Sequence, residues 1–353
     1  MPGKTLHSDR EPCTEVADRQ DGGADGQRQS TEAPPANVCG DARVPEPTTA
    51  NLPAGSARRS ASIFPGPSVA LPDEFCAAVG RLEGTFKIPI WLLIQGRSGK
   101  YQTISEHLVR ALRRSRCELP KGQRIGLVID SSGGDARAAY QTAMLIRRRC
   151  GGFLAIIPRR AKSAATLLTL GADGIALGTD GELGPLDAQF MDPDREDVIS
   201  ALDEFQALER LHAFALEAVD SSMMLMVPRT RKKLETLMPL VLKFVTDMTR
   251  PLFESVDAVH YTQMARALKV AEDYAVRLLR QRYGDEKAEQ VARHLVQQYP
   301  EHGFVIDAQE ADSFGLKTIE LSVDQLEAVD TLSLLLDDND PTVFGCLMEL
   351  KPK

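Results

Sequence analysis

The chain has 353 residues, of which 43% are apolar, enough for one large domain or two smaller ones with their own cores. Its net charge of −8 argues against a dedicated nucleic-acid binder, because such proteins are usually basic. The six cysteines are scattered without a C-x-x-C pair, so we expect reduced thiols and no metal site. We also expect neither a signal peptide nor a membrane span, which favours a cytoplasmic location.

The N-terminal part of the chain, residues 1–70, differs in composition from the rest. It is rich in Pro, Gly, Ser, Thr, Asp and Arg, and it has almost no bulky apolar residue before Ile63. Such a segment buries too little surface to offset the entropy that it would lose on ordering. We therefore predict a disordered tail over residues 1–70.

Strand and helix patterns alternate over residues 71–194. Short continuous apolar runs are typical of strands buried on both faces, and they occur at residues 88–94, 124–129, 153–157 and 174–177. Helical spacing fits the segments at residues 103–116, 135–149 and 163–170. This alternation predicts an α/β domain with a mainly parallel sheet.

The character of the sequence changes between residues 195 and 299. Strand signals vanish, and charged residues alternate with Leu, Ala and Met at helical spacing, which predicts a helical insertion. Its Met and Leu stripes fit a buried core or, alternatively, a lid or an oligomer contact. We expect a return to the α/β core over residues 300–336 and a C-terminal tail over residues 337–353.

A glycine pair marks the first candidate for chemistry. The strand that ends near Ile129 is followed by Asp130-Ser131-Ser132-Gly133-Gly134-Asp135 and then by a helix. Paired glycines allow a positive φ and a close approach to a ligand, and their N–H groups can face a developing negative charge. A phosphate site would use the same physics, but the chain has neither a P-loop motif nor a convincing dinucleotide fingerprint.

Ser163 is the second candidate. It lies in the segment Pro158-Arg-Arg-Ala-Lys-Ser-Ala-Ala-Thr166, where a strand leads into a helix and small residues flank the serine. A helix N-terminus stabilises negative charge, and small neighbours leave room for a substrate backbone. Taken alone, Ser163 fits a helix N-cap as well as a nucleophile, and the G-x-S-x-G elbow of α/β-hydrolases is absent.

The order of these motifs resembles the Clp/crotonase superfamily. The strand–SSGG–helix and PRRAKSAAT segments are followed by GELGPLDAQ and, further on, by Glu310-Ala-Asp-Ser-Phe-Gly-Leu316, which is similar to the E-A-x-x-x-G-L ending of Clp-type peptidases. Within the superfamily the chain looks like the serine dehydrogenase proteinases, relatives of signal peptide peptidase A. The resemblance covers about residues 85–192 and 300–321. It implies a repeated ββα core with a mainly parallel sheet and a homo-oligomer, trimeric or hexameric.

The resemblance also implies roles for single residues. Ser163 matches the family nucleophile, and Gly133 and Gly134 match the glycine pair of the oxyanion hole. The backbone N–H of Ala164 would be the second donor of that hole. The implied activity is a serine peptidase that acts on peptides or proteins and needs no cofactor.

The sequence offers more than one candidate for the general base. Where Clp subunits carry a histidine, this chain has Asp187, and close to their aspartate position it has His302. One interpretation is a rearranged Ser163–His302–Asp187 triad, since triads are recognised by geometry and not by chain order. The alternative is a surface histidine and a turn aspartate. A Ser–Lys dyad is the rival, with Lys162, Lys243 and Lys269 as candidates, although the side chain of Lys162 should diverge from its neighbour.

Two other functions remain open at the level of sequence. A crotonase-type acyl-CoA enzyme would use the same oxyanion hole, but it typically carries acids or bases and not a helix-capping serine. A non-catalytic scaffold on the same fold is the other alternative, because no clear base stands beside Ser163 in the sequence.

Overall fold

The computed structural model describes residues 59–61, 69–96, 102–114, 119–187, 189–192, 197–339 and 341–349. The chain divides into two units, Met1–Ala54 and Gly55–Lys353, and every described residue belongs to the second. Most of the tail predicted for residues 1–70 thus lies outside the described residues. Strands β1 (Arg59–Ala61) and β2 (Val69–Ala70) are exceptions, because they pair with each other and β1 also pairs with β12 (Leu347–Glu349).

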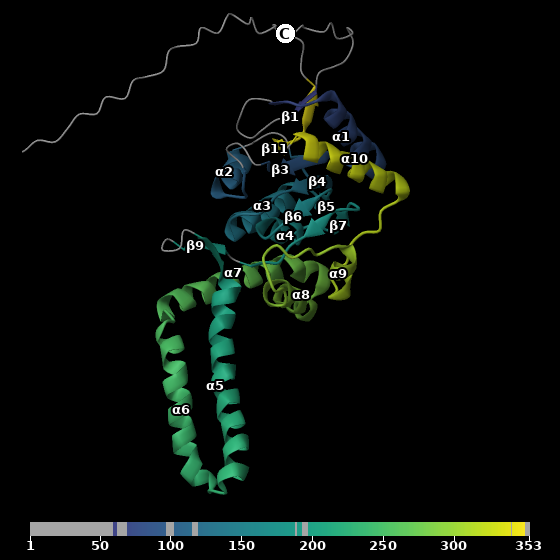
Figure 1. The fold of residues 1–353 in the computed structure, drawn as a ribbon. Coiled ribbons are helices and arrows are strands. Elements are labelled where there is room, and N and C mark those ends of the chain that lie inside the picture. The colour runs from purple at the N-terminus through teal and green to yellow at the C-terminus, as the bar shows by residue number, and fades with distance from the viewer. Residues whose placement is uncertain are drawn as a thin grey trace, which may run out of the picture. The chain divides into compact units, whose positions relative to one another are not determined.

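A five-stranded sheet forms the centre of the fold, in the order β11-β3-β4-β5-β7 (Figure 1). Four neighbouring strands run parallel, which confirms the predicted mainly parallel sheet. They are β3 (Ile90–Ile94), β4 (Ile125–Asp130), β5 (Phe153–Ile157) and β7 (Gly174–Leu177). Every residue of these strands is buried, because helices cover both faces of a sheet of this kind.

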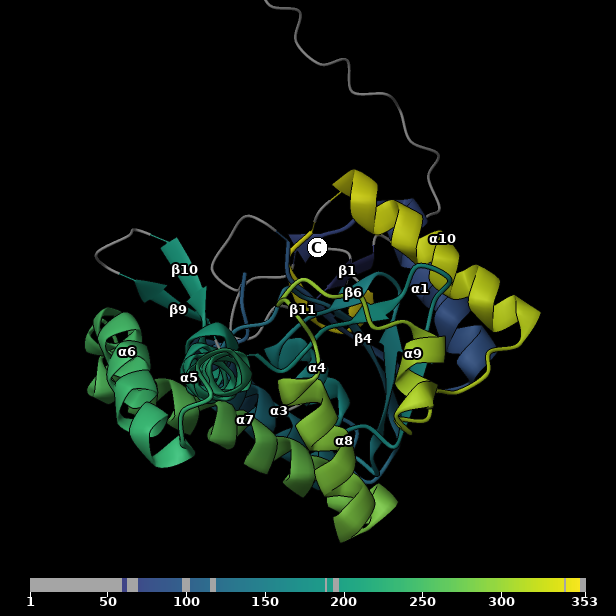
Figure 2. The same cartoon turned by 60° about the horizontal axis from the view of Figure 1, so that its bottom comes forward.

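Alternate side chains of the strands belong to two separate apolar clusters. Leu92 and Ile156 pack with α1 (Asp73–Phe86) and α10 (Val323–Asn339), which lie side by side on one face (Figure 2). The next residues along the same strands, such as Leu93, belong to the cluster on the other face. The helices of that cluster include α2 (Glu106–Arg114), α3 (Ala136–Arg149) and α4 (Ala164–Thr169).

Four helices account for most of the predicted helical insertion. They are α5 (Ala201–Thr230), α6 (Leu234–Glu254), α7 (Ala258–Tyr283) and α8 (Asp285–Gln297). A short antiparallel pair, β9 (Gln189–Asp192) and β10 (Asp197–Ser200), precedes them. Helices α5 and α6 lie side by side and share a small apolar cluster that includes Met223 and Leu237, while α7 and α8 join the larger core (Figure 1). Among the described residues, no helix has the length and apolarity needed to cross a lipid bilayer.

The C-terminal end differs from the sequence-based expectation of a tail from residue 337. Helix α10 continues to Asn339, and β11 (Val343–Gly345) pairs antiparallel with β3 at the edge of the main sheet. Val343 and Phe344 are almost completely buried. Backbone pairing with a strand about 250 residues earlier in the chain orders this segment, and short-range composition carries no signal of such a contact.

Candidate active site

The two candidate segments lie next to each other at the carboxyl ends of β4 and β5. Ser131, directly after β4, bridges to the short strand β6 (Arg160–Ala161), which follows β5. The N–H of Ser131 donates to the Arg160 carbonyl at 3.0 Å, and the N–H of Lys162 donates to the Ser131 carbonyl at 3.0 Å. The glycine turn and the serine are therefore held together by backbone hydrogen bonds.

Ser163 has a strained backbone. Its φ of 50° and ψ of −116° are unusual for a residue with a side chain, and such strain is concentrated at functional sites. Ser163 occupies the N-cap position of α4, but its hydroxyl makes no capping hydrogen bond. The Oγ atom lies instead 3.5 Å from the backbone oxygen of Asp187. The N-cap alternative therefore does not explain this serine.

Both positions of the glycine pair require glycine. Gly133 has a φ of 109°, and a Cβ atom there would lie 2.7 Å from the Lys162 carbonyl oxygen. Gly134 has a φ of 143°, and a Cβ atom there would collide with the backbone of Ile104. No L-residue with a side chain adopts these angles readily, so the turn depends on both glycines.

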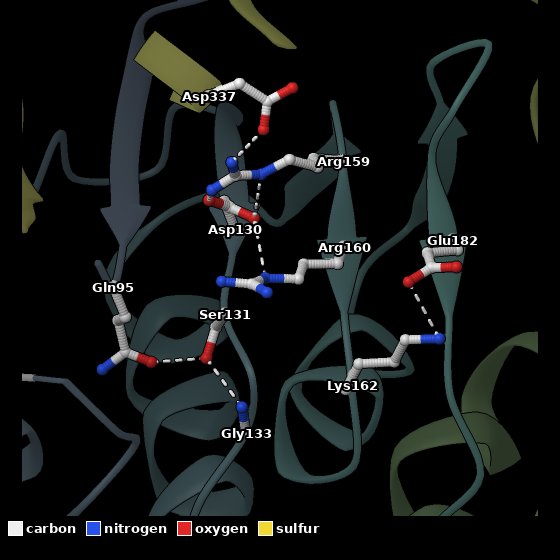
Figure 3. Close-up of polar contacts among 9 residues, drawn as sticks. All are labelled: Gln95, Asp130, Ser131, Gly133, Arg159, Arg160, Lys162, Glu182 and Asp337. Carbon is white, nitrogen blue, oxygen red and sulfur yellow. Dashed lines mark hydrogen bonds and ion pairs between the residues drawn. The ribbon is translucent and has the colours of Figure 1, made fainter. Parts of the chain in front are cut away.

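The N–H groups of the glycine pair differ in their partners. Gly133 donates to the Ser131 Oγ at 3.0 Å, and that hydroxyl donates in turn to Gln95 (Figure 3). Among the described residues, no acceptor binds the N–H of Gly134 or of Ala164. The family resemblance implies an oxyanion hole that involves Gly133, Gly134 and Ala164. Of these three, Gly134 and Ala164 have N–H groups without an acceptor among the described residues.

His302 and Asp187 approach each other although 115 residues separate them in the chain. The Nδ1 atom of His302 lies 3.7 Å from the Oδ2 atom of Asp187, and the two side chains are 22% and 3% exposed. The other carboxylate oxygen accepts the N–H of Leu202 at 3.3 Å. The His302 Nδ1 atom is buried without a hydrogen-bond partner in the described part of the chain, so a small approach to Asp187 would satisfy it.

All six residues predicted for the site line one cavity of about 820 Å³. They are Ser163, Gly133, Gly134, Ala164, Asp187 and His302. Apolar side chains from α4, from the segment before Asp187 and from α7 complete much of the wall, including Leu167, Leu186 and Val270. The structure thus brings together groups from four separate parts of the sequence.

The lysines proposed for a Ser–Lys dyad point elsewhere. Lys162 forms an ion pair with Glu182 at 3.0 Å and donates to the carbonyls of Leu183 and Phe304 at 3.2 and 3.1 Å. Lys269 on α7 pairs with Asp273 at 3.1 Å, and Lys243 is exposed on α6. No lysine is among the described residues that line the cavity.

A buried ion-pair network lies next to the site and was not predicted from the sequence. Asp130, the last residue of β4, is completely buried and accepts hydrogen bonds from Arg159, and Arg160 approaches it at 3.7 Å (Figure 3). Burial lowers the pKa of Arg159, but hydrogen bonds to Asp130 and Asp337 outweigh burial and raise that pKa above its usual value. The network therefore ties the start of the glycine turn to the segment that leads to Ser163.

Comparison with known proteins gives distant relatives. Two uncharacterized proteins of Methanocaldococcus jannaschii are 24% identical to this chain over 235 and 222 residues, which are 66% and 62% of the chain. The matched regions cover 63% and 59% of those proteins, so the chain spans about three fifths of their length. No solved structure matches at a significant level.

The model of one protein family matches residues 82–249, which include β3, the glycine turn, Ser163 and Asp187. That family is described as ClpP-like SDH-type serine proteinases, in agreement with the resemblance drawn from the motifs. The match supports a serine peptidase in general terms. Residues 82–249, a little under half of the chain, are therefore similar to the ClpP-like SDH-type serine proteinase family.

Proposed function

We propose that the protein hydrolyses peptide bonds in peptides or proteins with Ser163 as its nucleophile. The observation that carries this proposal is the convergence of a strained serine, two open N–H donors and a His–Asp pair in one cavity. A serine hydroxyl needs a neighbouring base to become reactive, and His302 is the only histidine among the described residues that line this cavity.

In the proposed reaction, His302 accepts the hydroxyl proton as the Ser163 Oγ attacks the scissile carbonyl carbon. Asp187 orients the imidazole and stabilises its charged form, as the acidic member of a triad does. His302 then gives the proton to the leaving amine, which leaves an acyl ester on Ser163. A water molecule gives a proton to the same histidine as it attacks the ester, and the histidine passes that proton to the departing Ser163 Oγ, which releases the acid and the free serine.

The N–H groups of Gly134 and Ala164 are the proposed oxyanion hole. Both are at turns that begin helices, and both lack a partner within the described chain, so they are free to donate to the developing oxyanion. A donor of this kind typically contributes about 3–4 kcal/mol to transition-state binding. Gly133 has a different role in the proposal: its hydrogen bond to Ser131 holds the turn in place.

A fluorophosphonate probe tests the nucleophile directly. We expect an adduct on Ser163 of the full-length protein, located by mass spectrometry, and no adduct in the Ser163→Ala variant. Ser132, which also lines the cavity, provides a matched control, because Ser132→Ala should label like the wild type. A folded protein that leaves Ser163 unlabelled while the probe modifies a standard serine hydrolase would overturn the proposal.

The base is tested in the same assay. His302→Ala and Asp187→Asn should slow the labelling of Ser163 by roughly 10²- to 10⁴-fold, the usual contribution of general base catalysis. His212→Ala on α5 is the control, since this exposed histidine does not line the cavity. Equal labelling rates in the His302 and His212 variants would exclude His302 as the base.

The homo-oligomer implied by the family resemblance is a separate prediction, which light scattering of the purified protein checks.

A further inference from the structure

Two arginines line the same cavity and have no place in the proposed reaction. Arg137 belongs to the first turn of α3, and Arg266 lies within α7. Both residues are exposed to solvent. Within the described part of the chain, neither guanidinium group has a partner at ion-pair or hydrogen-bond distance.

The acidic groups nearby are already engaged. The carboxylate of Asp135 caps α3 by accepting the Ala138 N–H at 2.6 Å, and Asp187 faces His302. Glu106 forms its ion pair with Arg110 at 2.9 Å, and its pKa is lowered chiefly by Arg110 and more weakly by Arg137. The positive charge of Arg137 and Arg266 is therefore not neutralised by an ion pair to these carboxylates.

Other arginines of the α/β core behave differently. Arg159 binds Asp130, Arg149 donates to the Leu112 carbonyl at 2.7 Å, and Arg147 donates to the side chain of Gln281. A guanidinium group binds a carboxylate through two parallel hydrogen bonds, which combine charge with geometry. Two unpaired guanidinium groups in the wall of a reaction cavity are thus complementary to a substrate carboxylate.

We propose that Arg137 and Arg266 make this site selective for peptides that carry a carboxylate close to the scissile bond. The inference rests on the proposed function, because it takes the peptide to lie beside Ser163. The carboxylate comes from an Asp or Glu side chain or from a free C-terminus. The apolar wall around it, which includes Leu167, Leu186 and Val270, suits an aliphatic neighbour in the same peptide.

The first experiment measures cleavage of a degenerate peptide library by the full-length protein, with products identified by mass spectrometry. Matched peptide pairs then follow, with Glu against Gln at each position and a free acid against an amide at the C-terminus. We expect kcat/KM to be about tenfold higher for the acidic member of at least one pair, as a charge-assisted hydrogen bond predicts. The pair that responds identifies the source of the carboxylate.

Variants connect the preference to the two arginines. In the R137Q/R266Q double variant the acid-to-neutral ratio of kcat/KM should fall to about one, and in R266E it should invert toward basic peptides. Arg277→Gln is the matched control on α7, because the Arg277 guanidinium lies over the Tyr274 ring at 5.8 Å and not in the cavity wall. Arg277→Gln should label Ser163 with fluorophosphonate at the wild-type rate and keep the wild-type acid-to-neutral ratio.

A binding measurement tests this inference independently of the peptidase proposal. The Ser163→Ala protein cannot acylate, so fluorescence anisotropy with the labelled Glu/Gln and free-acid/amide peptide pairs measures affinity alone. Tighter binding of the acidic member of either pair that is lost in S163A/R137Q/R266Q supports the carboxylate site even if Ser163 proves unreactive. Equal affinities within both pairs, or a preference that survives loss of both arginines, would overturn the inference.

Discussion

The ammonium group of Lys162 donates a hydrogen bond to the backbone oxygen of Phe304 at 3.1 Å, and Phe304 lies two residues beyond His302. The same ammonium pairs with Glu182 and donates to Leu183, whose backbone pairs in both directions with Ile306. The residue before the proposed nucleophile thereby anchors the loop that carries the proposed base. Lys162 is a positioning residue in this arrangement, whereas the sequence analysis considered it only as a candidate for a Ser–Lys dyad.

Replacing Lys162 should therefore slow the reaction without removing a reacting group. We expect Lys162→Met to slow fluorophosphonate labelling of Ser163 by roughly tenfold or more, since small displacements of a base are costly. Lys162→Arg keeps a donor and should restore part of the rate, with the wild-type pH profile. The control is Lys269→Met on α7, outside the cavity. If Lys162 itself took the proton, the Arg variant would be as inactive as the Met variant.

Replacing Gly134 with alanine adds only one methyl group but should strongly slow the reaction of Ser163. A methyl group there collides with the backbone of Ile104, and the φ of 143° is strained for alanine. We expect Gly134→Ala to slow labelling of Ser163 by roughly 10²- to 10³-fold as the proposed oxyanion donor moves. Gly84→Ala in α1 is the matched control, because a Cβ atom there meets nothing within 4 Å. That variant should label normally and unfold at a slightly higher urea concentration.

The ion pair between Arg159 and Asp130 should affect the stability of the fold more than the reaction of Ser163. Arg159→Met leaves the buried Asp130 carboxylate with Arg160 at 3.7 Å, and removal of one partner of a buried pair typically costs about 3–5 kcal/mol. Urea unfolding should show this loss, and adding Asp130→Asn should recover part of it. Arg81→Met is the comparison, since its exposed pair with Glu327 should contribute about 1 kcal/mol or less. Equal losses in the two single variants would contradict the network's role.

Much of the core and part of the candidate site could be predicted from local sequence. The strands around Leu92 and Ile156 are buried on both faces, so each appears as an uninterrupted apolar run. Gly133 and Ser163 lie in turns that directly follow such strands, where parallel topology brings loop residues to one edge of the sheet. The pairing of Asp187 with His302 came from family resemblance and not from any local pattern.

The features that sequence reasoning missed depend on contacts between distant segments. Arg266 lies in a long helix whose spacing shows which face is apolar, but not which cavity its polar residues line. Lys162 and Asp130 each form an ion pair with a residue from another segment of the chain. No regular spacing in the sequence indicates which residue that partner is. The β11 strand is too short to show a period and is ordered by β3 alone within the main sheet.

The buried surroundings of His294 predict how the free energy of unfolding depends on pH. Its ring stacks on Phe314 with centroids 4.4 Å apart and meets Tyr299 edge-on, and burial lowers its pKa more than the nearby Glu310 raises it. The unfolded chain therefore binds a proton at His294 more tightly than the folded protein, so protonation favours unfolding. The free energy of unfolding should fall as pH drops through about 6.5, the unfolded value, toward the lower folded pKa. His294→Phe keeps an aromatic ring and should flatten this slope in urea titrations between about pH 7 and 5, whereas the exposed His212→Phe should leave it unchanged. A slope that persists in His294→Phe would assign the pH dependence to another group.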